Sequence, residues 1–344
     1  MQFGLMYFNS GAPSLGVWNR DFFDSLEQAV LADRVGFNSV LVSEHHFTEQ
    51  GYTTSPNIVC GMLAARTGNV RIGPGVALLP LHHPVALAEE AALLDRMSNG
   101  RYIMGVGLGY RREEFEGYNI SLKEGSSRLE EGIKIIDLLL SQEKVSFDGQ
   151  YYHLREVNLT PRPIQKPRPP IWVGAKAEAP VRRAARLGDV WFMDPVTPLK
   201  VLKERMSMYE EELRRAGKEP AVEKPLRREA YVANDNETAW KEGGDKILQK
   251  WHNYFVWGHV QDEDGKLLDP EEHDFDVMKE MMRRRYVVGD PDAVIEQAER
   301  YQKELGATQL VFQLQFPGLT HEKAMNAIRL IGERVIPYFR DQSK

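Results

Sequence analysis

A junction that recurs five times along the chain constrains its fold more than any other feature. At each junction a helix-like stretch ends near a glycine, and an apolar run follows within a few positions. Glycine is favoured just after a helix because it adopts the left-handed conformation without steric cost. The runs are apolar throughout rather than alternating, which indicates strands buried on both faces of a parallel sheet. The five glycines are Gly36, Gly68, Gly100, Gly188 and Gly306.

Three further apolar runs, at residues 2–8, 171–177 and 228–233, bring the number of expected strands to eight. Eight strands separated by helices in 344 residues predict a (β/α)8 TIM barrel of the α/β class, with residues 1–344 as a single domain. A doubly wound sheet with a second domain is the alternative, and it would need fewer strands in one sheet. Helices are expected over 22–35, 85–98, 126–141, 180–187, 200–216, 291–305 and 321–337.

Two insertions interrupt the repeat. Residues 144–170, after strand four, are predicted to form a hairpin turning at Asp148–Gly149, followed by a proline-rich extended connection. Residues 234–289 lie between strands seven and eight. Loops of this length in a compact domain are usually functional, so we expect a lid or pocket wall there, with simple packing as the alternative.

Charge and hydropathy argue against several classes of protein. A net charge of −6 and a pI near 5.9 disfavour a nucleic-acid or membrane-surface role. No apolar run approaches about 18 residues and no basic-then-apolar leader begins the chain, so neither membrane spanning nor secretion is expected. The single cysteine, Cys60, can form neither an internal disulfide nor a thiolate cluster. This fits a cytoplasmic protein.

Two adjacent histidines, His45 and His46 in "VSEHHFTEQG", follow the second strand. The active site of a barrel lies at such strand ends. Successive strand side chains point to opposite faces, so neighbouring histidines cannot face the same metal. His82 and His83 have the same spacing. We therefore expect no metal site, with one histidine of the first pair over the barrel mouth and the other packed sideways.

Glycines and a helix start after strands four and five indicate a site for a flat ring and an anion. "MGVGLGY", residues 104–110, breaks the dinucleotide-binding pattern. In a barrel its glycines instead let the backbone approach a flat ring closely. Pro180 occupies a first helical position, and a helix N-terminus offers N–H groups to an anion. Arg128 is either the paired charge or a solvated helix arginine.

Together these segments resemble the bacterial-luciferase-like family of flavin-dependent enzymes. The resemblance covers nearly the whole chain in the same order, and "EHHFTE" with "SNGR" is its most specific part. It is carried by "EHHFTEQG", "LLPLHHPVALAEEAALLDRMSNGR", "GVGLGYRREEFEGY", "LTPRPIQKPRPPIWVGAKAEAPVRRAARLGD", "VVGDPDAVIEQ" and "GATQLVFQLQFPG".

The resemblance implies a TIM barrel that binds reduced FMN (FMNH2) at the strand C-termini and uses O2 to oxygenate a small organic substrate through a C4a-peroxyflavin. It also implies a separate NAD(P)H-flavin reductase as partner, and a homodimer formed by the helices after strands two and three. Three alternatives remain open. They are hydride transfer with F420 on the same fold, a non-catalytic flavin-binding protein, and a metal-dependent barrel hydrolase.

Carried over to this sequence, the family's catalytic histidine is His45, and His46 is structural. An imidazole titrates near neutrality, which suits hydrogen bonding or acid–base work on the flavin adduct. A non-prolyl cis peptide is expected at Gly75–Val76. The implied flavin-binding residues are Val76, Ala77, Gly107, Leu108, Tyr110, Arg128, Gly174, Ala175, Lys176 and Ala177.

The sequence departs from luciferase itself at the flavin site. Gly107 stands where luciferase has a reactive cysteine, and Leu108 where it has a phosphate-contacting arginine. Ala177 and Pro180 replace its phosphate-binding Ser and Thr. The phosphate is therefore expected to rely on backbone N–H groups, Arg128, and Arg111 or Arg112. For the substrate, the second insertion offers an apolar wall made of Trp251, His252, Tyr254, Phe255 and Trp257.

Overall fold

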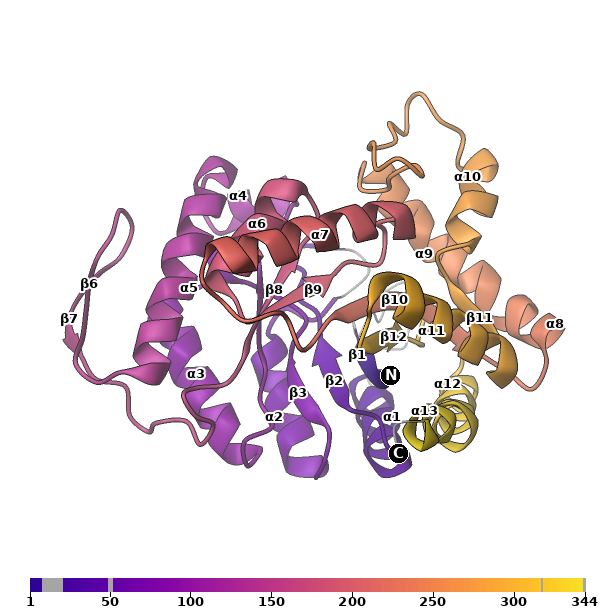
Figure 1. The fold of residues 1–344 in the computed structure, drawn as a ribbon, viewed down its shortest axis with the longest axis horizontal. Helices are drawn as coiled ribbons and strands as arrows, with labels where there is room; N and C mark the ends of the chain where they lie inside the picture. The colour runs from indigo at the N-terminus through magenta and orange to yellow at the C-terminus, as the bar shows by residue number, and fades with distance from the viewer. Residues whose placement is uncertain (8–20, 49–51, 317, 343–344) are drawn as a thin grey trace.

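The computed structural model describes residues 1–7, 21–48, 52–316 and 318–342. In this part of the chain, parallel strands form one curved sheet (Figure 1). Its order is β3-β2-β1-β12-β10-β9-β8-β5-β4. Only Gly75 and Val76 separate β3 from β4, so the two ends of this order are halves of one strand and the sheet closes into a barrel. The predicted (β/α)8 fold is confirmed. The barrel strands are β1 (Gln2–Tyr7), β2 (Ser39–Val42), β3 (Arg71–Pro74), β4 (Ala77–Leu78), β5 (Met104–Gly107), β8 (Ile171–Ala175), β9 (Val190–Met193), β10 (Pro225–Val232) and β12 (Gln309–Gln313).

Helices surround the barrel and match the predicted ranges within a few residues. For α2, which the sequence predicts before Gly68, no range was given. The last predicted helix is divided by a π-helical turn at Ile331–Val335. The surrounding helices are α1 (Asp21–Val35), α2 (Pro56–Arg66), α3 (Pro84–Met97), α5 (Gly125–Ser141), α6 (Glu178–Leu187), α7 (Leu199–Arg215), α11 (Pro291–Leu305), α12 (His321–Leu330) and α13 (Ile336–Asp341).

The five junction glycines do not all serve the same purpose. Gly36, Gly100 and Gly306 have φ angles of 96°, 80° and 70°, as predicted for residues that end a helix in the left-handed conformation. Gly68 and Gly188 do not, and the prediction is wrong for them. At Gly188, with φ −98°, a Cβ would lie 2.6 Å from the Val173 side chain, so close packing rather than handedness requires glycine.

Apolar side chains fill the barrel interior below the strand C-termini. A second and larger core lies between the strands and the helices. At the opposite end of the barrel, the Arg71 guanidinium lies 5.4 Å from the centre of the Trp172 ring and pairs with Glu223 at 2.7 Å. The interior is thus a packed core, and only its C-terminal end is open to a ligand. The interior cluster is Met6, Leu41, Ile103, Trp172, Val190, Phe192 and Val311.

The first insertion is the predicted hairpin. Strands β6 (Val145–Asp148) and β7 (His153–Val157) are antiparallel, and the Gly149 N–H donates to the Tyr152 carbonyl at 3.0 Å. The hairpin projects away from the barrel beside α5, on the left in Figure 1.

The second insertion is mostly helical and packs at the opposite side of the barrel (Figure 1). It contains α8 (Asn236–Ala239), α9 (Asp245–Val256) and α10 (Phe275–Arg283). It ends in β11 (Val287–Gly289), which pairs with the end of β10 in parallel. The long connection therefore has a fold of its own, attached to the barrel by a strand.

Candidate functional site

A cavity of about 370 Å³ opens at the C-terminal ends of the barrel strands. This size is within the range of small-molecule sites, and the position is where barrel enzymes hold their ligands. The described lining residues are Met6, Ser43, Glu44, His45, Gly75, Val76, Leu78, Gly107, Leu108, Gly109, Tyr110, Gly174, Ala175, Lys176, Ala177, Pro180, Phe192, Met193, Asp194, Pro195, Val196, Arg227, Tyr254 and His259.

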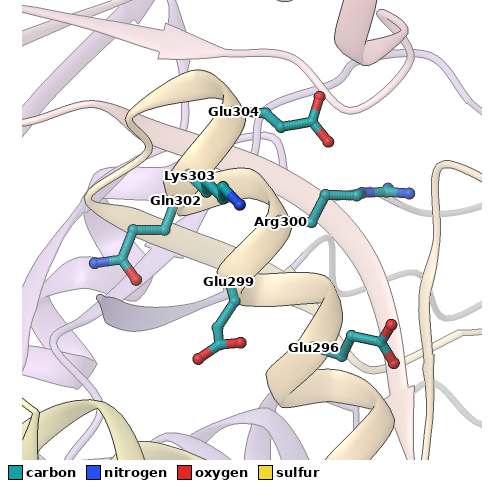
Figure 2. A pocket seen from close by; sticks show the side chains of 6 residues that line it. All are labelled: Glu296, Glu299, Arg300, Gln302, Lys303 and Glu304. Atoms are coloured by element: carbon teal, nitrogen blue, oxygen red, sulfur yellow. The ribbon is translucent and has the colours of Figure 1, made fainter.

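A larger hollow of about 870 Å³ lies on the outer surface and is lined by α11 alone (Figure 2). Its side chains are polar or charged, and they make ordinary surface contacts, such as Lys203–Glu304 at 3.4 Å and Tyr338 to Glu299 at 2.6 Å. Side chains of one helix cannot enclose a ligand, so this surface is not a candidate site. Its residues are Glu296, Glu299, Arg300, Gln302, Lys303 and Glu304.

His45 faces the cavity and is held from behind by a carboxylate. Its Nδ1 lies 2.8 Å from Oε1 of Glu114, which is fully buried in α4 (Arg112–Gly117). A carboxylate accepts only, so Nδ1 carries the proton and Nε2 is the nitrogen available to the cavity. The rings of Tyr52 and Tyr110 meet the imidazole edge-on, at 5.1 and 5.7 Å between centres. The ring is therefore fixed in both tautomer and orientation.

His46 turns away from the cavity, so the two rings diverge as the strand geometry predicts. Its Nε2 lies 2.7 Å from Oε1 of buried Glu44, and the same oxygen lies 2.6 Å from Nε2 of His82. Burial alone would raise the pKa of Glu44, but His46, His82 and the Leu78 N–H lower it to about 2. Glu44 thus ties the end of β2 to β4 and to the residues just before α3. Among the described residues no cluster of three His, Cys, Asp or Glu is placed to hold a metal.

The floor of the cavity is a flat backbone surface beside Val76. The Gly75–Val76 peptide is cis, as predicted. A Cβ at Gly107 would lie 2.5 Å from Cγ2 of Val76, and one at Gly174 would lie 3.2 Å from its Cγ1. Glycine at both positions therefore leaves room for Val76 under a flat ligand. Ala77 is buried in β4 and is not among the lining residues.

The start of α6 lines one end of the cavity, where the sequence predicts an anion site. Ala177, the N-cap residue of α6, makes no side-chain hydrogen bond to the helix. The first N–H groups of α6 therefore receive no side-chain cap from it. Lys176 lines the cavity, and its Nζ donates to the His259 carbonyl at 3.1 Å. Burial lowers the pKa of Lys176, and an anionic group beside it would relieve that cost.

The predicted phosphate arginine does not reach this end. Arg128 points toward the hairpin, where its Nε donates to Glu124 at 2.9 Å and its guanidinium lies 4.4 Å from the Tyr151 ring centre. Arg111 donates to the His46 carbonyl at 2.7 Å and also does not line the cavity. Lys176 is the cation that takes their place.

Of the residues predicted to form the substrate wall, only Tyr254 lines the cavity. Trp251 is fully buried against Tyr286, and Phe255 is buried against Phe275. His252 is exposed beside Phe275, and Trp257 lies under the Arg111 guanidinium. Because side chains point in different directions around a helix axis, only one face of α9 meets the cavity, and Tyr254 lies on that face.

The sequence motifs did not indicate several of the residues found at the cavity. His259 stacks on Tyr110 with ring centres 4.2 Å apart, and burial together with nearby Lys176 lowers its pKa to about 3. It is therefore a neutral ring at neutral pH. Arg227 lies within β10, and Asp194 directly follows β9. The alternation along β10 and the position after β9 could have indicated these two residues. Glu114 lies in "RREEFEG", a charged helix in which nothing distinguishes the buried carboxylate.

Comparison with known proteins finds a family model and several relatives that each cover most of the chain. A family model described as luciferase-like monooxygenase matches residues 1–309. The oxygenase component of the flavin-dependent trigonelline monooxygenase of Acinetobacter baylyi is 29% identical over 335 residues, covering 92% of this chain and 90% of that protein. The F420-dependent glucose-6-phosphate dehydrogenase of Microbacterium testaceum is also 29% identical over 335 residues, covering 92% and 93%. The crystal structure of monooxygenase RslO1 from Streptomyces bottropensis superposes with a TM-score of 0.86 at 29% identity, covering 98% of this chain and all of that one. No helix in the described part of the chain is long and apolar enough to span a bilayer.

Proposed function

Because the chain belongs to the luciferase-like monooxygenase family, we propose that it is the oxygenase component of a two-component flavin monooxygenase, using FMNH2 and O2 to oxygenate a small organic substrate. The observation that carries this proposal is the pair His45–Glu114, with its Nδ1–Oε1 distance of 2.8 Å, above a floor that glycines keep flat. An acid–base group fixed beside a flat-ring site is what oxygen chemistry on a flavin requires.

The residues present fit FMN. Val76, Gly107 and Gly174 would lie against the flat ring system, and the first turn of α6 with Lys176 would hold the phosphate. The buried hydroxyl of Tyr110 has no partner among the described residues and faces this cavity. When bound there in its reduced form, the flavin supplies two electrons and activates O2.

His45 acts at the cavity through Nε2, while Glu114 keeps the proton on Nδ1. Nε2 therefore accepts a hydrogen bond or proton from the reacting group in the neutral state, and returns that proton from the imidazolium, which Glu114 stabilises. Glu114 does not line the cavity, so it is a positioning residue. Tyr52 and Tyr110 flank the imidazole and keep bulk water from its edges.

A second candidate is F420-dependent hydride transfer, favoured by the equal identity of the F420-dependent relative. Equilibrium dialysis of the purified protein against FMNH2 under anaerobic conditions, and separately against F420, tests the two. We expect FMNH2 to bind and F420 to bind at least about tenfold more weakly, because α6 and Lys176 offer one compact anion site. Tighter binding of F420 would reverse the assignment, and binding of neither would reject both.

Two partners follow from this proposal. FMNH2 is supplied by a separate NAD(P)H-dependent flavin reductase, which is supported by the similarity to a protein named as the oxygenase component of a flavin-dependent monooxygenase. A homodimer forms through α2 and α3, where Ile58, Leu93 and Met97 are 71%, 50% and 52% exposed. Analytical ultracentrifugation tests the dimer, and a monomer at micromolar concentration would contradict it.

A further inference from the structure

His259 is the residue through which the second insertion contacts the α6 end of the cavity. It directly follows the turn that ends α9. The His259 N–H donates to the Tyr254 carbonyl at 2.8 Å, and the Gly258 N–H donates to the Phe255 carbonyl at the same distance. Gly258 has a φ of 62°, so these bonds form a Schellman motif with glycine in the left-handed conformation. The end of the helix therefore fixes the backbone of His259 beside the barrel.

Two atoms of His259 contact one ammonium group of the barrel. Lys176 Nζ donates to the His259 carbonyl at 3.1 Å and lies 3.3 Å from its Nδ1. An ammonium group only donates, so Nδ1 is the unprotonated nitrogen of this ring and Nε2 carries the proton. An ammonium group has three donors, so two contacts to His259 leave a donor for a ligand in the cavity that Lys176 lines.

The ring of His259 is held in the orientation that these contacts need. It stacks on the Tyr110 ring with centres 4.2 Å apart and an angle of 11° between the planes. Burial, and then the charge of Lys176, lower the pKa of His259 to about 3, so the ring is neutral at neutral pH. A neutral ring accepts a hydrogen bond from the Lys176 ammonium, whereas an imidazolium would repel it.

Lys176 needs an anchor because its side chain is long. A lysine side chain has many rotamers and loses considerable conformational entropy when it is held in one of them. Burial also lowers the pKa of Lys176, with Asp194 opposing this and Arg205 adding to it. The ammonium acts fully on a ligand at the start of α6 only when it is held there, and His259 supplies two acceptors that hold it.

We propose that His259 is a positioning residue of the cofactor site, which accepts hydrogen bonds from Lys176 and thereby holds the ammonium where the cofactor phosphate binds. The second insertion, which the sequence indicates only as a lid or pocket wall, then takes part in recognition of the flavin. This inference rests on the proposed function for the identity of the cofactor. It adds a residue from outside the barrel on which recognition of the phosphate depends.

The test is a comparison of FMN with riboflavin, which lacks the phosphate. Equilibrium dialysis of the full-length protein against each reduced flavin, under anaerobic conditions, gives two dissociation constants, and their ratio measures what the phosphate contributes. We expect the wild-type protein to bind reduced FMN about 10- to 100-fold more tightly than reduced riboflavin, the size of a hydrogen bond to a charged group. Equal affinities would show that no phosphate site exists and would overturn the inference.

Two substitutions of His259 separate its stacking from its hydrogen bond. His259→Phe keeps an aromatic ring to stack on Tyr110 but removes Nδ1, and it should reduce the preference for FMN about 3- to 10-fold with little change for riboflavin. His259→Asn loses the stacked ring but places an amide oxygen near the position of Nδ1, and it should retain the preference within about twofold. The backbone carbonyl remains in both variants, so the loss is partial. A full preference in His259→Phe, or an equal loss in both variants, would overturn the inference.

Two further variants set the limits of this measurement. Lys176→Met removes the ammonium and should abolish most of the preference for FMN, and retention of the preference would overturn the inference as well. His252→Phe makes the matched substitution at an exposed position of α9 and should leave both dissociation constants unchanged. A variant that fails to fold loses both flavins, so the ratio reports on the phosphate alone. Failure of the wild-type protein to bind either reduced flavin would instead reject the proposed function.

Discussion

The two sides of the cavity are built in different ways. The barrel side comprises His45, Glu114, Val76, Gly107 and Gly174, which come from β2 to β8 and lie beside recognisable motifs. The insertion side comprises Arg227 and Glu229 of β10, Gln313 of β12, and Lys250 and His259, which the second insertion adds. We propose a division of labour, with chemistry on the barrel side and substrate binding on the insertion side. Variants on each side test whether the two sides have these different roles.

The largest effect is expected on the barrel side, at His45. His45→Ala should lower turnover by about 10²- to 10⁴-fold, because it removes the group that transfers the proton at the reacting centre. Turnover is measured as label incorporated from isotopically labelled O2 into the best substrate of a panel of aldehydes, ketones and organic acids. A loss below tenfold would remove His45 from the catalytic role.

Glu44→Gln should have the next largest effect, on stability. The pKa of Glu44 falls from its ordinary 4.5 to about 2 in the folded protein. The folded state therefore binds fewer protons than the unfolded state between these values. This contribution to the free energy of unfolding, about 3 kcal/mol, is present above about pH 4.5 and is lost as the pH falls toward 2. Glu44 also raises the pKa of His82, against the effect of burial. The stabilisation that protonated His82 contributes is therefore present at acidic pH and is lost as the pH rises through that raised pKa.

Urea unfolding at pH 7, 5.5 and 4 measures the effect of Glu44→Gln. The deficit relative to wild type should be greatest at pH 5.5, where Glu44 is ionised and His82 is protonated. It should be smaller at pH 7, where the contribution of His82 is being lost, and should start to shrink again near pH 4. Glu113→Gln is the matched control, because that carboxylate is 64% exposed and surface pairs contribute little. Equal unfolding midpoints for the two variants would show that the Glu44 cluster does not support the fold.

Glu114→Gln should lower kcat by about 10- to 100-fold with little change in KM, as expected for a group that orients another. The amide of glutamine can donate to Nδ1, which favours the other tautomer and turns the unprotonated nitrogen away from the cavity. Glu114→Asp should restore part of the rate. If both variants lost activity only in proportion to their loss of thermal stability, Glu114 would be structural and not a positioning residue.

The smallest effect should come from the part of the insertion that faces away from the cavity. His252→Ala and Val256→Ala, both exposed on α9, should change turnover by less than about twofold. Tyr254→Phe, on the cavity-facing side of the same helix, should change turnover more than either of these variants, because its hydroxyl contacts Arg227 at the cavity wall. A large effect of His252→Ala on turnover would support the substrate wall that the sequence predicted.

The barrel could be predicted from the sequence, because local patterns determine its strands. The residues expected at the cavity from the family resemblance are mostly among those that line it. Glycines at helix ends and fully apolar runs specify the strands, and the "EHH" spacing separates His45 from His46. The insertion side could not be predicted in the same way. Which face of α9 meets the barrel depends on tertiary packing, so four aromatic or histidine positions looked equivalent to Tyr254. Arg128 was misplaced for a similar reason, since the hairpin that draws it aside packs by tertiary contact.

The central claim is that the barrel side controls the reaction of reduced FMN with oxygen. It is tested most directly by mixing the anaerobic protein–FMNH2 complex with oxygenated buffer in a stopped-flow spectrometer. The account predicts an absorbing species distinct from both reduced and oxidised FMN, which persists in the wild-type protein and decays faster in His45→Ala. Direct oxidation of FMNH2 at the rate seen in free solution, with no such species, would contradict it.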